Sequence, residues 1–224
     1  EVIGDIAGSV ERLGNRLRGK HPSDPAAYAN VHEDIAAHIR QGSDDGRFPM
    51  VPQRIVADVR AVMGRDDIVA LDNGIYKIWF ARNYIAHGPN TILLDNALAS
   101  MGAGLPSAMM AAMLSPERRV LAVCGDGGFM MNSQEMETAV RLGLNLVVVI
   151  LNDSAYGMIR WKQSVDGFPD FGMTFGNPDF VRYAEAYGAK GSRVSAVEDL
   201  FPVLEAAFDG GGVHLVDVPI DYSE

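Results

Sequence analysis

Two apolar runs, each followed by an acidic turn, constrain the fold of this chain more than any other feature. The run 120–124 leads into Gly-Asp-Gly-Gly at 125–128, and the run 146–151 leads into Asn152 and Asp153. One helix-length segment separates the runs, which is typical of two parallel strands joined by a crossover helix. Asp126 and Asp153 should then lie side by side at the carboxyl edge of a sheet, where open α/β sheets bind ligands.

Two adjacent carboxylates in such turns indicate a divalent metal ion that holds a diphosphate. Like charges about 4 Å apart repel by roughly 4 kcal/mol at an effective dielectric of about 20, so the pair favours a cation between them. The glycines permit the close backbone approach and positive φ angles of a phosphate-binding turn. Each turn alone has an ordinary structural explanation, because Asn, Asp and Gly are common turn residues. Their pairing supports the metal site.

The rest of the chain alternates strand and helix patterns from residue 52 onward. Helical patterns cover 52–63, 74–84, 98–114, 133–142, 155–163 and 196–208, and we expect Asn132 and Glu135 to form a capping box. Six segments have strand character, and these are 67–71, 91–94, 120–124, 146–151, 190–194 and 213–218. This order predicts an α/β fold with a doubly wound, mainly parallel six-stranded sheet and helices on both faces.

The first 50 residues have a different character. Residues 2–17 and 26–39 have helical spacing, a Gly- and Pro-rich break at 19–25 separates them, and a charged loop follows at 42–48. The chain starts without Met inside the first helical pattern, and we therefore expect a fragment. The turn Asp72-Asn73-Gly74-Ile75-Tyr76 follows the first strand and could add phosphate contacts at the same sheet edge.

Composition excludes several classes of function. A net charge of −10 without a basic block argues against nucleic acid or an anionic membrane as partner. The longest apolar run, 144–151, is too short to cross a bilayer. Cys124 is the only cysteine, which rules out an internal disulfide and fits a reducing cytoplasm. The order Ser-His-Asp, zinc-ligand spacing and a G-x-G-x-x-G motif after an early strand do not occur.

The two acidic turns resemble the signature of the thiamine diphosphate-dependent enzymes, a GDG turn followed by a paired Asn or Asp turn. From about Met50 to Glu224 the chain is similar to their C-terminal, diphosphate-binding domain, and most of all to that of acetolactate synthases. Further matches are 74–79 (GIYKIW), Ser100-Met101-Gly102 and 216–222 (VDVPIDY). Residues 1–20 resemble the end of the family's middle domain, 21–50 would be a linker, and 51–224 the cofactor domain.

The resemblance implies a specific set of contacts. Asp126, Asp153 and the carbonyl of Ala155 would bind Mg²⁺, and Met101 would hold the cofactor bent. The implied cofactor-binding residues are Gly74, Ile75, Tyr76, Ala99, Met101, Gly125, Asp126, Gly127, Gly128, Asp153, Ala155, Tyr156 and Gly157. No catalytic residue is expected in this chain, because in the family an activating glutamate comes from an N-terminal domain that nothing here resembles.

The implied reaction is decarboxylation of pyruvate and ligation of its acyl unit to a second 2-keto acid, in a cytoplasmic homo-oligomer. Binding of FAD by the parent enzyme stays open. Three positions depart from the common pattern: Asp153 replaces a frequent Asn, Ala99 a frequent Gly, and Lys162 a tryptophan that shapes acceptor choice. The alternatives are another 2-keto acid decarboxylase or carboligase of the superfamily, and a non-catalytic diphosphate-binding module.

Overall fold

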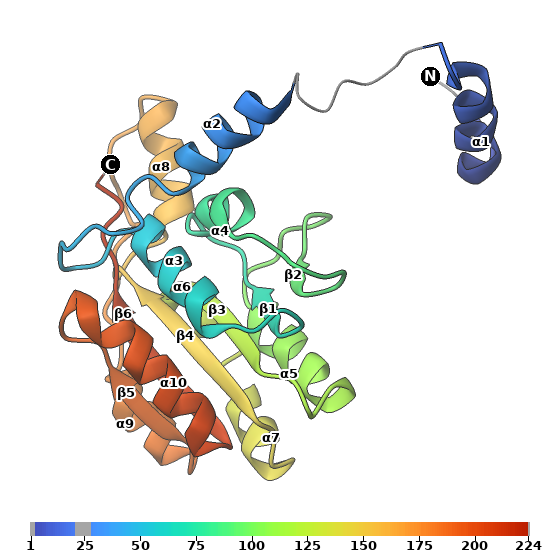
Figure 1. The fold of residues 1–224 in the computed structure, drawn as a ribbon. Coiled ribbons are helices and arrows are strands. Elements are labelled where there is room, and N and C mark those ends of the chain that lie inside the picture. The colour runs from blue at the N-terminus through green and yellow to red at the C-terminus, as the bar shows by residue number, and fades with distance from the viewer. Residues whose placement is uncertain (1–2, 21–27, 224) are drawn as a thin grey trace. The chain divides into compact units, whose positions relative to one another are not determined.

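The computed structural model describes residues 3–20 and 28–223 and divides the chain into two compact units, Glu1–Ile39 and Arg40–Glu224 (Figure 1). The predicted Gly- and Pro-rich break lies mostly outside the described residues, as do the starts of both N-terminal helical patterns and the last residue of the predicted cofactor domain. In the described part of the chain, no helix is long and apolar enough to cross a membrane.

The first unit contains two helices, α1 (Ile6–Leu17) and α2 (Ala29–Ile39). Asp5 caps α1, because its carboxylate accepts a hydrogen bond from the amide of Gly8 at 2.5 Å. The apolar side chains of α1 recur at helical spacing and stay exposed. Both helical patterns are therefore confirmed from Ile6 and from Ala29 onward, whereas residues 3–5 are not helical.

The second unit contains a six-stranded sheet in the order β2-β1-β3-β4-β6-β5, with every neighbouring pair parallel. The strands are β1 (Ile68–Leu71), β2 (Ile92–Leu94), β3 (Val120–Gly125), β4 (Leu146–Asn152), β5 (Lys190–Arg193) and β6 (Val213–Pro219). All six predicted strands are confirmed within two residues at each end. The doubly wound parallel fold is confirmed as well.

Helices cover both faces of the sheet, as the near-continuous apolar character of β3 and β4 predicts. Alternate strand residues enter two separate cores, one beneath each helical layer. One layer consists of α3 (Pro52–Val62), α4 (Lys77–Asn83) and α10 (Leu200–Gly210). The other consists of α5 (Gly104–Leu114), α6 (Asp126–Phe129), α7 (Glu135–Arg141) and α9 (Phe180–Ala186).

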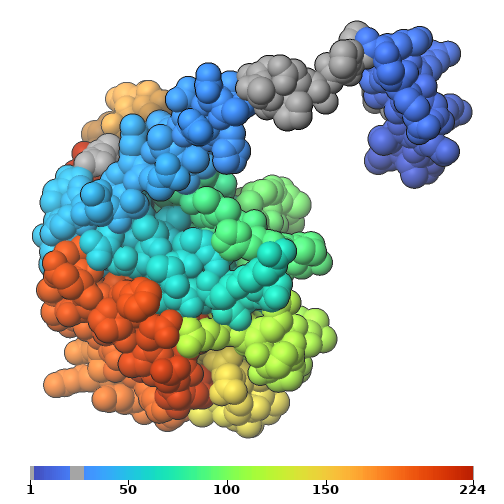
Figure 2. Space-filling view, viewed as in Figure 1, coloured from blue at the N-terminus to red at the C-terminus, as the bar shows by residue number. Residues whose placement is uncertain are grey.

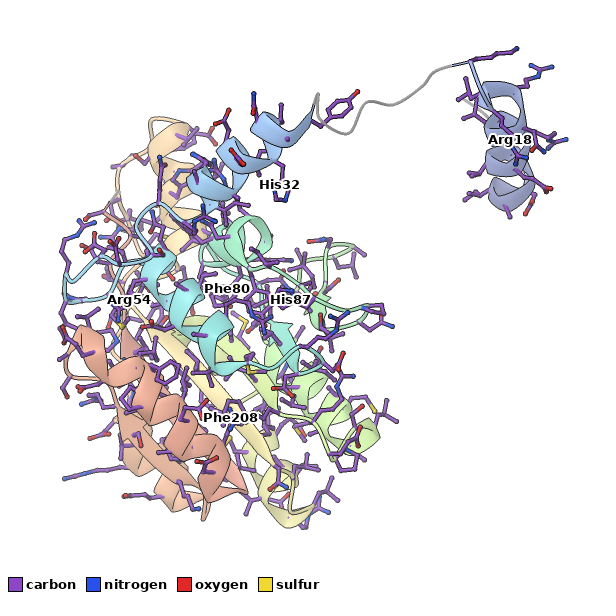
Figure 3. All side chains as sticks on the ribbon, viewed as in Figure 1. Arg18, His32, Arg54, Phe80, His87 and Phe208 are labelled. Carbon is purple, nitrogen blue, oxygen red and sulfur yellow. The ribbon has the colours of Figure 1, made fainter. Side chains whose placement is uncertain are left out.

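Figure 2 shows α3 and α10 packed side by side on one face of the second unit. Phe80 from α4 is part of the core on this side, and Phe208 from α10 packs against that core (Figure 3). The guanidinium of Arg119 lies 5.1 Å from the centre of the Phe208 ring and pairs with Glu205 at 2.7 Å. These contacts lie away from the carboxyl ends of the strands and stabilise the scaffold.

The strand order places a ligand crevice at β1. This strand connects onward to its neighbour β2, whereas β3, its neighbour on the other side, connects onward to β4, so the strand order reverses between β1 and β3. Such a reversal opens a crevice at the carboxyl ends of the strands. The turns after β1, β3 and β4 meet there.

Two local predictions are wrong. The helix expected from residue 98 begins only at Gly104, because Ala99 and Gly102 have φ angles of 51° and 86°. Asn132 does not cap α7: its side-chain amide donates to the carbonyl of Gly102 at 2.8 Å, and α7 has no side-chain cap. In both cases a tertiary contact outweighs the local sequence preference.

Candidate functional site

A cavity of about 550 Å³ lies at the carboxyl ends of β1, β3 and β4. Its wall contains every residue that the sequence predicts for cofactor contact: Gly74, Ile75, Tyr76, Ala99, Met101, Gly125, Asp126, Gly127, Gly128, Asp153, Ala155, Tyr156 and Gly157. Four separate segments of the chain thus converge on one site. The contacts assigned to each residue stay predictions.

Asp126 begins α6 directly after β3 and is almost completely buried. One carboxylate oxygen accepts the amide of Gly127 at 2.8 Å, and the other accepts the amide of Ser154 at 2.7 Å. The second bond ties the β3 turn to the β4 turn. Burial raises the pKa of Asp126, and these hydrogen bonds oppose that rise.

Asp153 follows β4, which is paired with β3 up to Gly125 and Leu151. Burial, followed by the nearby charge of Asp126, raises the pKa of Asp153 to about 6. The two carboxylates therefore repel each other, and a cation between them would relieve the repulsion. No cluster of three or more acidic, His or Cys side chains occurs in the described residues. A metal ion here would thus need main-chain, ligand and water oxygens as well.

The glycines of the β3 turn permit close packing, which corrects the expectation of positive φ angles. Gly125, Gly127 and Gly128 all lie outside the left-handed region. A Cβ on Gly127 would lie 2.7 Å from the Tyr156 ring, and a Cβ on Gly128 would lie 2.5 Å from a carboxylate oxygen of Asp72. The turn is glycine-rich because neighbouring side chains occupy the space of any Cβ.

Tyr76 supplies its aromatic ring to the cavity wall. Its ring packs over Gly74 and Gly125, where an added Cβ would lie 2.5 and 3.0 Å from the ring. Within the described residues its hydroxyl is buried and has no hydrogen-bond partner. Because this hydroxyl is enclosed by the protein, the contribution of Tyr76 to the cavity wall is the packing of its ring.

Sequence reasoning missed two residues that organise the site. Asp72 is fully buried and accepts the amides of Gly102 and Ala103, whereas the sequence indicated a turn with phosphate contacts and no structural role for this carboxylate. Asn177 donates to the carboxylate of Asp126 at 2.7 Å. No sequence signal marks Asn177, because it lies in an irregular segment 51 residues downstream of its partner.

The remaining reactive groups lie elsewhere. Cys124 is buried in β3, and burial raises the pKa of its thiol well above the usual range, so it is inert as a nucleophile. His214 is buried in β6, where its Nε2 lies 2.9 Å from the hydroxyl of Ser192. His214 therefore lies in the protein interior, outside the cavity wall.

Comparison with known families decides what this cavity belongs to. Residues 72–218 match the family described as thiamine pyrophosphate enzyme, C-terminal TPP binding domain. The chain belongs to the thiamine diphosphate enzymes. The matched region begins at Asp72 and ends with β6, so it contains all three turns of the cavity.

Acetolactate synthases are among the thiamine diphosphate enzymes similar to this chain. The catabolic acetolactate synthase of Raoultella terrigena is 35% identical and the acetolactate synthase of Bacillus subtilis 32% identical, each over the whole chain. The chain spans 41% and 40% of their lengths. It is therefore similar to the C-terminal, cofactor-binding part of acetolactate synthases.

A solved structure supports the fold. The thiamine diphosphate-dependent 4-hydroxybenzoylformate decarboxylase of Rhodococcus jostii RHA1 superposes with a TM-score of 0.73 at 26% identity, covering 78% of this chain and 33% of that protein. The doubly wound sheet is thus shared with a thiamine diphosphate-dependent decarboxylase.

Proposed function

We propose that this chain binds thiamine diphosphate through Mg²⁺ within an acetolactate synthase-like enzyme. The observation that carries the proposal is the meeting of two acidic turns at one cavity. Asp126 and Asp153 follow adjacent strands, line the same wall and influence each other electrostatically. With the carbonyl of Ala155, they supply the oxygen ligands that Mg²⁺ prefers, and diphosphate oxygens and water would complete an octahedron.

The chemistry of the wall fits this cofactor. The acidic pair and the amides of Gly127 and Gly128 lie at one part of the cavity, where a metal-bound diphosphate would be held. Apolar side chains such as Ile75, Met101 and Met158 supply surfaces for aromatic rings.

The role of this chain is to hold and orient. The bound cofactor would supply the electron sink that allows a 2-keto acid to lose CO₂. Met101 and Ala99 would fix its ring end, and Asp126 and Asp153 its charged end. We assign no catalytic residue to this chain and propose that the activating glutamate comes from another domain. The relatives are long enough to contain such a domain, since this chain spans about two fifths of their length (41% and 40%).

Pyruvate is the proposed donor substrate, and a second 2-keto acid is the proposed acceptor. Two relatives named acetolactate synthase align over the entire chain, at 35% and 32% identity, whereas the decarboxylase structure covers 78% of it at 26% identity. We also propose a cytoplasmic homo-oligomer, in which residues 1–20 derive from a middle domain, 21–50 form a linker and 51–224 bind the cofactor. The single cysteine is in keeping with a reducing compartment.

Calorimetric titration tests the cofactor site. Thiamine diphosphate should bind in the presence of Mg²⁺ and only weakly in the presence of a chelator. Asp126→Ala should abolish the Mg²⁺-dependent part of the affinity. Asp58→Ala is the control, because Asp58 is also buried but pairs with Arg54 on α3, away from the cavity. Unchanged Mg²⁺-dependent affinity in a folded Asp126→Ala variant would remove the metal assignment.

A second candidate is a decarboxylase of the same superfamily, which the structural similarity to 4-hydroxybenzoylformate decarboxylase favours. The products formed from pyruvate by the intact enzyme distinguish the two functions. Acetolactate indicates carboligation, and acetaldehyde indicates decarboxylation alone. If the intact enzyme binds the cofactor but turns over neither pyruvate nor benzoylformate, a non-catalytic binding module is the better description.

A further inference from the structure

Three polar side chains of one segment hold a single loop of the cavity wall. The segment is residues 72–77, which follows β1 and ends at the first residue of α4, and we call it the β1 turn. The loop is residues 95–103, between β2 and α5, and we call it the 95–103 loop. This loop contributes Ala99 and Met101 to the cavity. Its fixation therefore determines the position of two residues in the wall.

Asp72 holds the end of the 95–103 loop. One of its carboxylate oxygens accepts the amide of Gly102 at 2.8 Å and that of Ala103 at 3.1 Å. The same oxygen accepts the amide of Asn73 at 2.8 Å. Burial raises the pKa of Asp72, and the backbone donors oppose this rise. The other carboxylate oxygen also accepts the amide of Gly102, at 3.0 Å. An asparagine here would place its NH₂ group against that donor and lose this second contact.

Asn73 and Lys77 hold the middle and the start of the loop. The side-chain amide of Asn73 donates to the carbonyl of Ser100 at 2.8 Å. The ammonium of Lys77 donates to the side-chain oxygen of Asn73 at 2.5 Å and to the carbonyl of Asp95. The β1 turn thus contacts the loop at three points along its length.

Few other contacts fix the 95–103 loop. It contains no regular secondary structure, and residues 96–100 are exposed. Ala99 has a φ angle of 51°, a conformation that a non-glycine residue adopts at an energetic cost. Outside the β1 turn, the side-chain amide of Asn132 donates to the carbonyl of Gly102 at 2.8 Å, near the end of the loop. The side-chain contacts to Asp95 and Ser100 come from the β1 turn, which therefore restrains the start and the middle of the loop.

Asp72 also lies against the acidic turn. A Cβ on Gly128 would lie 2.5 Å from one of its carboxylate oxygens, so the carboxylate packs directly on the β3 turn. Asp72 therefore lies between the 95–103 loop and the turn that contains Asp126. The side chains of Asn73 and Lys77 bond to the 95–103 loop and to each other, and not to the β3 turn. Substitution of Asn73 therefore separates the effect on the loop from the effect on the β3 turn.

We propose that Asp72, Asn73 and Lys77 are positioning residues. They hold the 95–103 loop, and with it Met101, in the position that contacts the ring end of the cofactor. This proposal rests on the proposed function. We call these three side chains the clamp. Inorganic diphosphate has no rings, and the loop would contact the ring end of thiamine diphosphate. The clamp should therefore affect the affinity for thiamine diphosphate much more than the affinity for inorganic diphosphate.

The test compares Asn73→Ala, Asp72→Asn and the control Asp58→Asn in the 224-residue chain. Calorimetry measures the affinity for thiamine diphosphate and, separately, for inorganic diphosphate, both with Mg²⁺. Asn73→Ala should weaken thiamine diphosphate binding about tenfold and leave inorganic diphosphate within about twofold. Asp72→Asn should weaken both ligands, since it also contacts the β3 turn. Asp58→Asn should change neither.

Hydrogen exchange provides a readout that does not depend on the cofactor. Amides of residues 95–103 should exchange faster in Asn73→Ala and Asp72→Asn than in the native chain, with β3 and β4 unchanged. The proposal would be overturned if Asn73→Ala lost affinity for both ligands to the same extent, or if hydrogen exchange in the loop were unchanged. If the native chain binds neither ligand, the proposed function itself fails, and that outcome is distinct from a native chain whose variants bind equally well.

Discussion

Asn177 donates one side-chain amide to both a carboxylate oxygen of Asp126, at 2.7 Å, and the side-chain oxygen of Asn152, at 3.0 Å. Asn152 in turn donates to Asp217 at 3.0 Å, and Asp217 pairs with Arg193 at 2.8 Å. The predicted metal ligand is therefore the last member of a polar network that crosses β4, β6 and β5. This network fixes the carboxylate before any cation binds.

Removal of the Asn177 amide should loosen Asp126. In Asn177→Ala one carboxylate oxygen keeps only the amide of Ser154, and the loss of a hydrogen bond to a charged group costs about 1.5–3 kcal/mol. We expect Mg²⁺-dependent thiamine diphosphate affinity to fall about tenfold or more, as measured by calorimetry. Asn145→Ala is the control, because Asn145 accepts the amide of Gly212 outside the cavity. Equal affinities in native and Asn177→Ala chains would contradict the role of the network.

The high pKa of Asp153 should make metal binding depend on pH. Its carboxyl group has a pKa of about 6 in the folded chain, raised first by burial and then by Asp126, so protons compete with Mg²⁺ below that pH. The affinity for Mg²⁺ should fall as the pH decreases through about 6. Titrations of Mg²⁺ between pH 5 and 8 check this, and in Asp153→Asn the pH dependence should be much smaller. A flat profile in the native chain would contradict it.

Stability of the metal-free chain should follow the opposite trend. Because the folded pKa of Asp153 exceeds its ordinary value of 3.8, the folded state binds a proton more tightly than the unfolded state. Its contribution to stability is thus present below pH 3.8 and lost as the pH rises through about 6. Thermal melts with a chelator should show a smaller decline for Asp153→Asn over this range. Addition of Mg²⁺ at pH 7 should raise the melting temperature of the native chain.

Much of the fold and of the site follows from short-range sequence patterns. The β3 and β4 runs and their acidic turns are local, and their adjacency follows from the rule that consecutive parallel strands pair through one crossover. The position of Met101 and Ala99 at the same cavity is predicted from the family resemblance alone, because no sequence pattern in the 95–103 loop predicts the path of its backbone. Gly102, one of its left-handed residues, donates its amide to Asp72, and contacts over such separations leave no periodic signal.

The sequence also assigned the wrong reason to the glycines. Glycine favours both positive φ and close approach, and the pattern Gly-Asp-Gly-Gly does not distinguish them. Only the structure shows that Tyr156 and Asp72 occupy the space beside Gly127 and Gly128. The contact of Asn177 is also not predictable from the sequence, because its partner Asp126 is distant in the chain and the segment between 167 and 179 is largely irregular.

Gly128→Ala should test whether this packing matters for the scaffold. The new Cβ would lie 2.5 Å from the Asp72 carboxylate, which is itself held by backbone amides and cannot move without releasing the 95–103 loop. We expect a loss of about 1–3 kcal/mol in the free energy of unfolding, as for other overpacked sites. Thermal or denaturant unfolding of the metal-free chain measures it. Gly46→Ala is the control, because no atom lies within 4 Å of its Cβ and its φ is not positive. If both variants have the same free energy of unfolding as the native chain, the Asp72 carboxylate can move to accommodate the new Cβ. The glycine at 128 is then required for ligand binding and not for packing.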